Sequence, residues 1–205
     1  MRFKSPSRNP ARLDRLDAAG TELLAFAIVA ALALSESGRR LDDRAFERLH
    51  LALTATRTRR MMAWVASFGG WFGTAVVVSF LMLLRGRPMT ALRVFVAAAL
   101  AWSAAQTLKS VVGLERPWDR LEGVRRTGGI PRGSAFPSGH PAVAAAIWRA
   151  VWQDRSVPLL FRLVLGASSV LVAVARIGVG AHYPADVVAG WLLGDAVGRI
   201  TSAAL

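Results

Sequence analysis

Cysteine is absent from the chain of 205 residues. The protein therefore has no disulfide bond, no thiolate nucleophile and no cysteine metal site. The sequence also contains no group of carboxylates suited to magnesium, an ion that takes oxygen ligands. These absences exclude disulfide-stabilised folds and cysteine-based catalysis.

Acidic residues are few, because 13 aspartates and glutamates stand against 26 lysines and arginines, for a formal net charge of +13. A strongly basic chain is typical of nucleic-acid-binding proteins. Here the basic residues lie between hydrophobic blocks, and no RNA- or DNA-binding motif accompanies them. We therefore expect no nucleic-acid partner, and interpret the charge as attraction to a membrane surface and an anionic substrate.

Charged residues of either sign make up only 19% of the chain, hydrophobic residues make up 54%, and the mean hydropathy is +0.39. A soluble domain usually has about a quarter charged residues. The apolar residues fall in blocks, and no small-residue cleavage site clearly follows the first of them. We expect an integral membrane protein whose first block is an uncleaved membrane helix.

Six apolar blocks predict an all-α, polytopic membrane helical bundle with about six transmembrane helices in a single domain, 1–205. The blocks comprise residues 18–34, 61–84, 91–112, 141–152, 159–175 and 187–200. Residues 1–17 are expected to form a basic N-terminal arm. Residues 39–60 are expected to form a short amphipathic helix on the membrane surface, with Phe46, Leu49 and Leu53 at helical spacing. His50, in that segment, is interpreted as a surface histidine.

Six helices place both chain termini at one face of the bundle. At the other face, the ends of the third and fifth helices meet the starts of the fourth and sixth. The unusual polar residues, between positions 109 and 186, belong to those four ends.

The first cluster consists of Lys109 and Arg116. A lysine near the end of an apolar block is a candidate functional residue, although a lysine snorkelling to the headgroups is an equally open interpretation. If the helix continues, Arg116 returns to roughly the same face two turns later. Two cations facing one way suit a tetrahedral anion.

The second cluster is Ser138-Gly139-His140, directly before an apolar block. Ser138 is suited to cap a helix, and Gly139 lets the backbone approach a ligand closely. The free amides of a helix N-terminus bind phosphate readily. A capped helix with an incidental histidine is the alternative.

The third cluster is Arg176, His182 and Asp186. Pro184 suggests that a helix starts there, with His182 just outside it. Asp186 follows His182 by four positions, so a carboxylate bonded to one ring nitrogen would leave the other free to attack. An ordinary interfacial loop is the alternative for this cluster alone. Together, the three clusters supply the nucleophile, the proton donor and the positive charges that phosphoryl transfer through a covalent intermediate needs.

The three clusters resemble the three signatures of the type-2 phosphatidic acid phosphatase (PAP2) superfamily, which also includes vanadium-dependent haloperoxidases. In the first signature, six residues separate Lys109 from Arg116-Pro117. Pro137-Ser138-Gly139-His140 matches the second signature in full, and Arg176, His182 and Asp186 have the usual spacing of the third. One position departs from the pattern: Ala175 stands where a phosphate-binding serine usually precedes the arginine. The loss of one hydrogen bond, about 1 kcal/mol, is expected to weaken phosphate binding but not to abolish activity.

The resemblance implies that His182 attacks phosphorus and is oriented by Asp186, while His140 protonates the leaving oxygen and then activates water. It implies that the phosphoryl oxygens are held without any metal or cofactor by Lys109, Arg116, Ser138, Gly139 and Arg176. The implied function is that of a lipid phosphatase acting on a phospholipid or a polyprenyl (pyro)phosphate-type lipid.

Alternatives are a phosphotransferase, a non-catalytic lipid-binding protein on the same fold, and a vanadium haloperoxidase, whose known members are typically soluble. The sequence does not distinguish the lipid headgroups, and it leaves the oligomeric state open. The loop 127–134 and its neighbouring arginines are expected to contact the headgroup. Basic residues flank both faces, so the site is assigned to the extracytoplasmic face of a prokaryotic plasma membrane by resemblance alone.

Overall fold

The structure, a computed structural model, describes residues 10–54, 58–68, 71–124, 126–127 and 133–205. The described residues form helices and connecting turns without any strand, as the sequence predicts. The helices are α1 (Pro10–Leu34), α2 (Glu36–Leu53), α3 (Thr58–Phe68), α4 (Trp71–Leu84), α5 (Pro88–Val112), α6 (Pro117–Arg120), α7 (Gly139–Trp152), α8 (Leu159–Gly178) and α9 (Pro184–Ala204).

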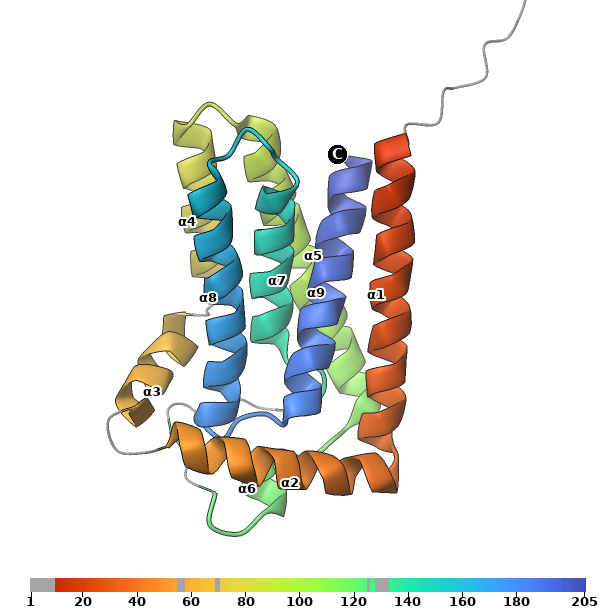
Figure 1. Cartoon of the computed structure of the whole chain (residues 1–205), viewed down its shortest axis with the longest axis vertical. Helices are drawn as coiled ribbons and strands as arrows, with labels where there is room; N and C mark the ends of the chain where they lie inside the picture. The colour runs from red at the N-terminus through yellow and green to blue at the C-terminus, as the bar shows by residue number, and fades with distance from the viewer. Residues whose placement is uncertain (1–9, 55–57, 69–70, 125, 128–132) are drawn as a thin grey trace, which may run out of the picture.

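The helices α1, α4, α5, α7, α8 and α9 run upright, and both ends of the chain's helical part lie at the top of Figure 1. Among the described residues, three segments are long and apolar enough to cross a membrane: Pro10–Leu34, Pro88–Arg120 and Leu159–Gly178. The apolar stretch Gly73–Leu84 is shorter. In length and composition, these segments are typical of an integral membrane protein.

Small residues allow the upright helices to approach closely. The largest core cluster is dominated by alanines of α5 and α7, among them Ala97, Ala101, Ala142 and Ala146. On α9, a Cβ at Gly194 would overlap the carbonyl oxygen of Ala142 in α7, and one at Gly190 would overlap that of Ser138, the N-cap of α7. Small residues at a spacing of four are the usual means by which membrane helices pack tightly, and here they seat α9 against α7.

A buried ion network, which the sequence reasoning did not foresee, joins the same helices. Asp195 of α9 pairs with Arg149 of α7 and, at 2.8 Å, with Arg199. Arg199 reaches Glu22 of α1 at 3.8 Å. Charges inside an apolar bundle are tolerated when they pair with one another.

Helix α2 lies across the lower end of the bundle (Figure 1). Ser35 ends the preceding turn and caps α2, because its Oγ accepts a hydrogen bond of 3.1 Å from the Gly38 amide. At Gly38 a Cβ would overlap the Leu32 carbonyl group. Ser35 and Gly38 therefore allow the sharp change of direction between α1 and α2.

Several predicted boundaries are wrong. The block 61–84 forms two helices, α3 and α4, rather than one; the sequence between them carries Gly69 and Gly70, and glycine disfavours helix. The predicted arm 1–17 contains the first two turns of α1 from Pro10 onward, and residues 1–9 lie outside the described part. The surface segment 39–60 corresponds to α2, which already ends at Leu53. The short helix α6 lies between the predicted blocks 91–112 and 141–152, where no helix is predicted.

Candidate active site

The three clusters meet at the lower end of the bundle, where α5 and α8 end and α7 and α9 begin. Ser138 links the second cluster to the third, because its amide donates to the Asp186 carbonyl oxygen at 2.9 Å. Lys109 and Arg116 both donate to the Ser134 carbonyl, at 2.6 and 3.2 Å, just before the second cluster. The predicted convergence of these residues is therefore present in the structure.

The helix of Lys109 does not continue to Arg116, so the condition for a shared helical face is not met. Helix α5 ends at Val112, and Gly113 adopts a left-handed conformation with φ of 66°. Arg116 is consequently the N-cap of α6 and does not continue the helix of Lys109. The two cations nevertheless converge, because the chain turns back after Gly113.

Arg116 is buried and anchored by the backbone. Its guanidinium donates to the carbonyl oxygens of Ala181, at 2.9 Å, and Gly133, at 3.2 Å, in addition to Ser134. The ring of Trp118 lies 5.4 Å from its Cζ. Arg116 thus holds the segment around His182 and the segment before the second cluster in one arrangement.

His182 lies between a cation and a carboxylate. Its Nδ1 is 3.3 Å from Asp186 Oδ2, and its Nε2 is 3.3 Å from Arg116 Nη1. Because arginine only donates, Nε2 must accept, and the ring proton belongs on Nδ1 facing Asp186. Burial lowers the pKa of His182, and nearby positive charges lower it further. The geometry therefore leaves an unprotonated Nε2.

Asp186 is held by two contacts. Its Oδ2 also accepts a hydrogen bond of 2.9 Å from the Tyr183 amide. Pro184 occupies the first position of α9, as predicted, so His182 lies just before the helix. The local turn thereby fixes the carboxylate next to the imidazole.

Ser138 and Arg176 carry buried donors with no hydrogen-bond partner in the described part of the chain, namely Ser138 Oγ and Arg176 Nε. Ser138 occupies the N-cap position of α7, as predicted, but its hydroxyl makes no capping hydrogen bond. A desolvated donor without a partner destabilises a protein. These two donors are available to a ligand oxygen.

The remaining predicted residues belong to the same region. Gly139 and His140 form the first turn of α7, and a Cβ at Gly139 would lie 3.2 Å from the Trp102 ring. Ala175 is fully buried against Met62, Val65 and Ala66 of α3. The residues whose charges act on His182 are Arg176, Lys109, Arg116 and His140.

Two residues of α2 that the sequence reasoning missed also bind this region. Asp42 Oδ1 accepts a hydrogen bond of 3.0 Å from the Ala185 amide. His50, predicted at the surface, is 6% exposed; it stacks on Phe46 and donates from Nδ1 to the Ile177 carbonyl at 3.1 Å. Here the apolar face of α2 packs against the rest of the protein. The amphipathic pattern of the sequence is the same whether such a face contacts the protein or the membrane.

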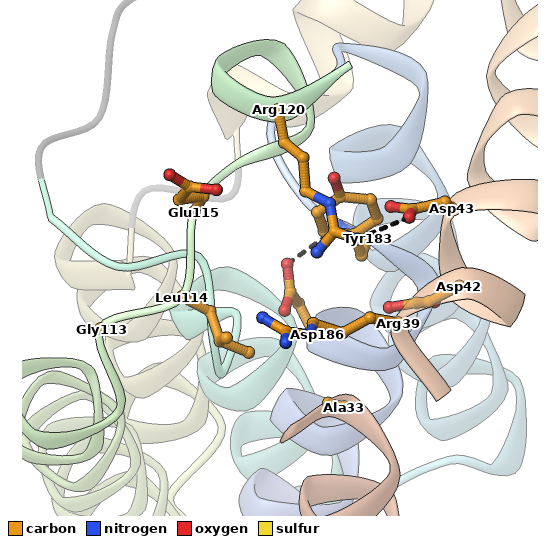
Figure 2. A pocket seen from close by; sticks show the side chains of 10 residues that line it. All are labelled: Ala33, Arg39, Asp42, Asp43, Gly113, Leu114, Glu115, Arg120, Tyr183 and Asp186. Carbon is orange, nitrogen blue, oxygen red and sulfur yellow. Dashed lines mark hydrogen bonds and ion pairs between the residues drawn. The ribbon is translucent and has the colours of Figure 1, made fainter. Parts of the chain in front are cut away.

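A cavity of about 270 Å³ lies between α2, the link from α5 to α6, and the start of α9 (Figure 2). Asp186 lines it together with Arg39, Asp42, Asp43, Glu115, Arg120 and Tyr183. Arg120 pairs with Asp43 across it at 2.8 Å. Most of the loop 127–134, predicted to contact a headgroup, lies outside the described residues.

Comparison with known proteins gives a consistent family. Residues 90–205 match the model of the PAP2 superfamily, and this stretch contains all three clusters. An undecaprenyl-diphosphatase of Sulfolobus acidocaldarius is 25% identical over 135 residues, which are 66% of this chain. The chain spans 65% of that relative's length.

Two crystal structures are similar to this one. A transmembrane PAP2 type phosphatidylglycerolphosphate phosphatase from Bacillus subtilis has a TM-score of 0.76 and 20% identity, over 89% of this chain and 93% of the other. LpxE of Aquifex aeolicus has a TM-score of 0.67 and 25% identity, over 76% and 91% of the two chains. The first of these establishes a common fold.

Proposed function

Because the chain belongs to the PAP2 superfamily, we propose that it is an integral membrane lipid phosphatase with His182 as its nucleophile. Its substrate is a lipid that carries a terminal phosphate, either a phospholipid or a polyprenyl (pyro)phosphate. The observation that supports this most strongly is the position of His182 between Arg116 and Asp186.

The attack needs an unprotonated ring nitrogen and a stabilised imidazolium. Nε2 accepts from Arg116 and therefore carries a lone pair, beside a cation that attracts a phosphoryl oxygen. As Nε2 bonds to phosphorus, the ring becomes positive, and Asp186 stabilises the Nδ1 proton. The P–O bond to the lipid breaks, and His140 gives a proton to the leaving oxygen.

The second step releases phosphate. His140, now neutral, takes a proton from water, the water oxygen bonds to phosphorus, and the P–N bond breaks. Lys109, Arg116 and Arg176 supply fixed positive charge around the phosphoryl oxygens, and Ser138 Oγ and the Gly139 amide donate to them. These cations take the role that a metal has in other phosphatases, so the reaction proceeds without one.

The membrane arrangement is also part of the proposal. The upright helices α1, α4, α5, α7, α8 and α9 cross the bilayer six times, and α2 lies at the surface on the side of the candidate site. Exposed leucines such as Leu24, Leu83 and Leu160 support a hydrocarbon environment. We propose, from the resemblance to the family alone, that this side faces the exterior of a prokaryotic plasma membrane.

The relatives point to the class of substrate. One is named for undecaprenyl diphosphate and another for phosphatidylglycerolphosphate. Both substrates present a terminal phosphate on a membrane-embedded chain. We therefore propose a lipid phosphate or pyrophosphate rather than a soluble phosphate ester.

The proposal is tested by measuring phosphate release from purified protein in detergent with EDTA, across phosphomonoester and pyrophosphate lipids. We expect release from at least one lipid, and none from His182→Ala. With a pyrophosphate lipid, His140→Ala is still expected to form the acid-labile phosphohistidine, because this good leaving group needs no proton. The phosphohistidine should then accumulate, because the variant cannot activate water. Near-normal release by folded His182→Ala would rule out the covalent mechanism.

A further inference from the structure

The end of the bundle opposite the candidate site is strongly basic. There α4 ends at Leu84 and α5 begins at Pro88, while α7 ends at Trp152 and α8 begins at Leu159. The two turns lie side by side at the top of Figure 1. The cavities at this end of the bundle are lined by Arg85, Arg87 and Arg93, and we call this region the arginine end.

An apolar cleft of about 350 Å³ adjoins the arginine end, between α4 and α8. It is lined by Arg85 and Arg87 together with Leu81, Met82, Val157, Pro158, Leu160, Phe161 and Val164. Leu81 lies one helical turn, about 6 Å, below Arg85, and Val164 lies about 9 Å below Pro158. The cleft therefore runs from the charged end into the apolar part of the bundle.

A second, more open and polar cavity of about 490 Å³ shares Arg85 and Arg87 with the cleft and adds Arg93. Arg87 is already bound, because it donates to the Ser156 carbonyl at 2.5 Å and pairs with Asp154 at 3.4 Å. Arg85 and Arg93 have no ion-pair partner among the described residues, and Arg93 Nε is buried without a hydrogen bond. Their positive charge is not neutralised within the described chain.

Two helix N-termini increase the attraction for an anion. Helices α5 and α8 begin at this end, and neither has a side-chain capping bond. The positive end of a helix dipole favours a negative group near its first turn. Both the side chains and the backbone at this end thus favour an anion.

We propose that the arginine end binds one anionic phospholipid from the leaflet opposite the candidate active site. The phosphate lies between Arg85 and Arg93, and one acyl chain occupies the cleft between α4 and α8. A free anion would leave the adjoining apolar cleft unused, and a zwitterionic lipid would bring its own cation toward unneutralised arginines. Basic pockets between membrane helices suit anionic headgroups for the same reason.

The experiment measures binding of dioleoylphosphatidylglycerol to the full chain in non-ionic detergent, by native mass spectrometry. This lipid is a phosphodiester without a terminal phosphate, so the proposed phosphatase reaction does not consume it. The comparison ligands are dioleoylphosphatidylcholine, with the same chains, and glycerophosphoglycerol, the headgroup without chains. We expect the anionic lipid to bind at least tenfold more tightly than either; equal binding of any comparison ligand would overturn the assignment.

Two variants locate the site, and a third is the matched control. Arg85→Gln is expected to weaken binding of the anionic lipid about tenfold, and Val164→Trp to weaken it similarly by filling the cleft. Arg155→Gln removes the same charge from an exposed position at the same end that lines neither cavity, and should leave binding unchanged. Equal effects of Arg85→Gln and Arg155→Gln would show only nonspecific charge attraction and would contradict the proposal.

Discussion

Asp42 of α2 accepts a hydrogen bond of 3.0 Å from the amide of Ala185, the residue that directly precedes Asp186 on α9. It thereby satisfies one of the free donors in the first turn of α9. Helix α2 lies outside the stretch 90–205 that matches the family. A residue outside the family signatures thus holds the helix that positions the candidate His–Asp pair.

Removing the acceptor should impair turnover more than removing the charge. Loss of a helix cap costs about 1 kcal/mol, and a comparable rise in the barrier would lower kcat of Asp42→Ala roughly fivefold to tenfold. Asp42→Asn keeps an acceptor oxygen and should stay within about twofold of the wild type, with KM little changed in both. Steady-state kinetics would check this, with Glu47→Ala on the exposed face of α2 as the control. Equal losses in the two Asp42 variants would assign the effect to charge.

Asp42 should also make stability depend on pH. Burial raises the pKa of Asp42 from 3.8 to about 6, although the hydrogen bond from Ala185 acts in the opposite direction. Between these values the folded protein keeps a proton that the unfolded chain releases, so stability falls as pH rises through this window and then levels off.

Asp42→Asn removes this penalty. Its unfolding midpoint in detergent should therefore exceed that of the wild type at about pH 8, and the difference should shrink toward about pH 4. Thermal unfolding followed by circular dichroism across this range provides the measurement. A difference between the two unfolding midpoints that stays constant with pH would contradict a role for the Asp42 carboxyl in this pH dependence.

Ser138→Ala should separate stability from binding. The Ser138 hydroxyl is fully buried and has no hydrogen-bond partner in the described structure, so its removal should leave the unfolding midpoint unchanged or higher. If the hydroxyl donates to a phosphoryl oxygen, kcat/KM falls roughly fivefold to tenfold, the effect of about 1 kcal/mol. Ser110→Ala, on an exposed part of α5, is the control and should change neither quantity.

Gly190→Ala should damage both the bundle and the site. A Cβ at this position would overlap the Ser138 carbonyl oxygen, so α9 and the second cluster must separate. Overpacking of this kind typically costs about 1–3 kcal/mol, and phosphate release should fall as well. Gly20→Ala, where nothing lies within 4 Å, should instead stabilise α1 by about 0.5–1 kcal/mol. Unfolding midpoints and phosphate release of the two variants test the difference.

The sequence predicted the convergence of the three clusters better than it predicted the helix boundaries. Successive upright helices alternate in direction, and this alternation brings Lys109, Ser138 and His182 to one end. The break between α3 and α4 was missed because their residues form one apolar run in composition. Asp42 and His50 could not be predicted, because their partners are backbone groups of Ala185 and Ile177, more than a hundred positions away. The glycines of α9 carried a readable signal, a spacing of four.

Among the described residues, helix α2 is held at the bundle end by a few polar contacts and by the buried Phe46. Asp42 and His50 bond to the segment around His182, and Asp43 pairs with Arg120 of α6. Helices α4, α5 and α7, in contrast, share the largest core cluster, which is rich in alanine. On heating, such a helix can detach in a local unfolding event while the rest of the protein stays folded. Phosphate release should then vanish at a lower temperature than the bulk of the helical signal, so that inactivation of this protein precedes its denaturation.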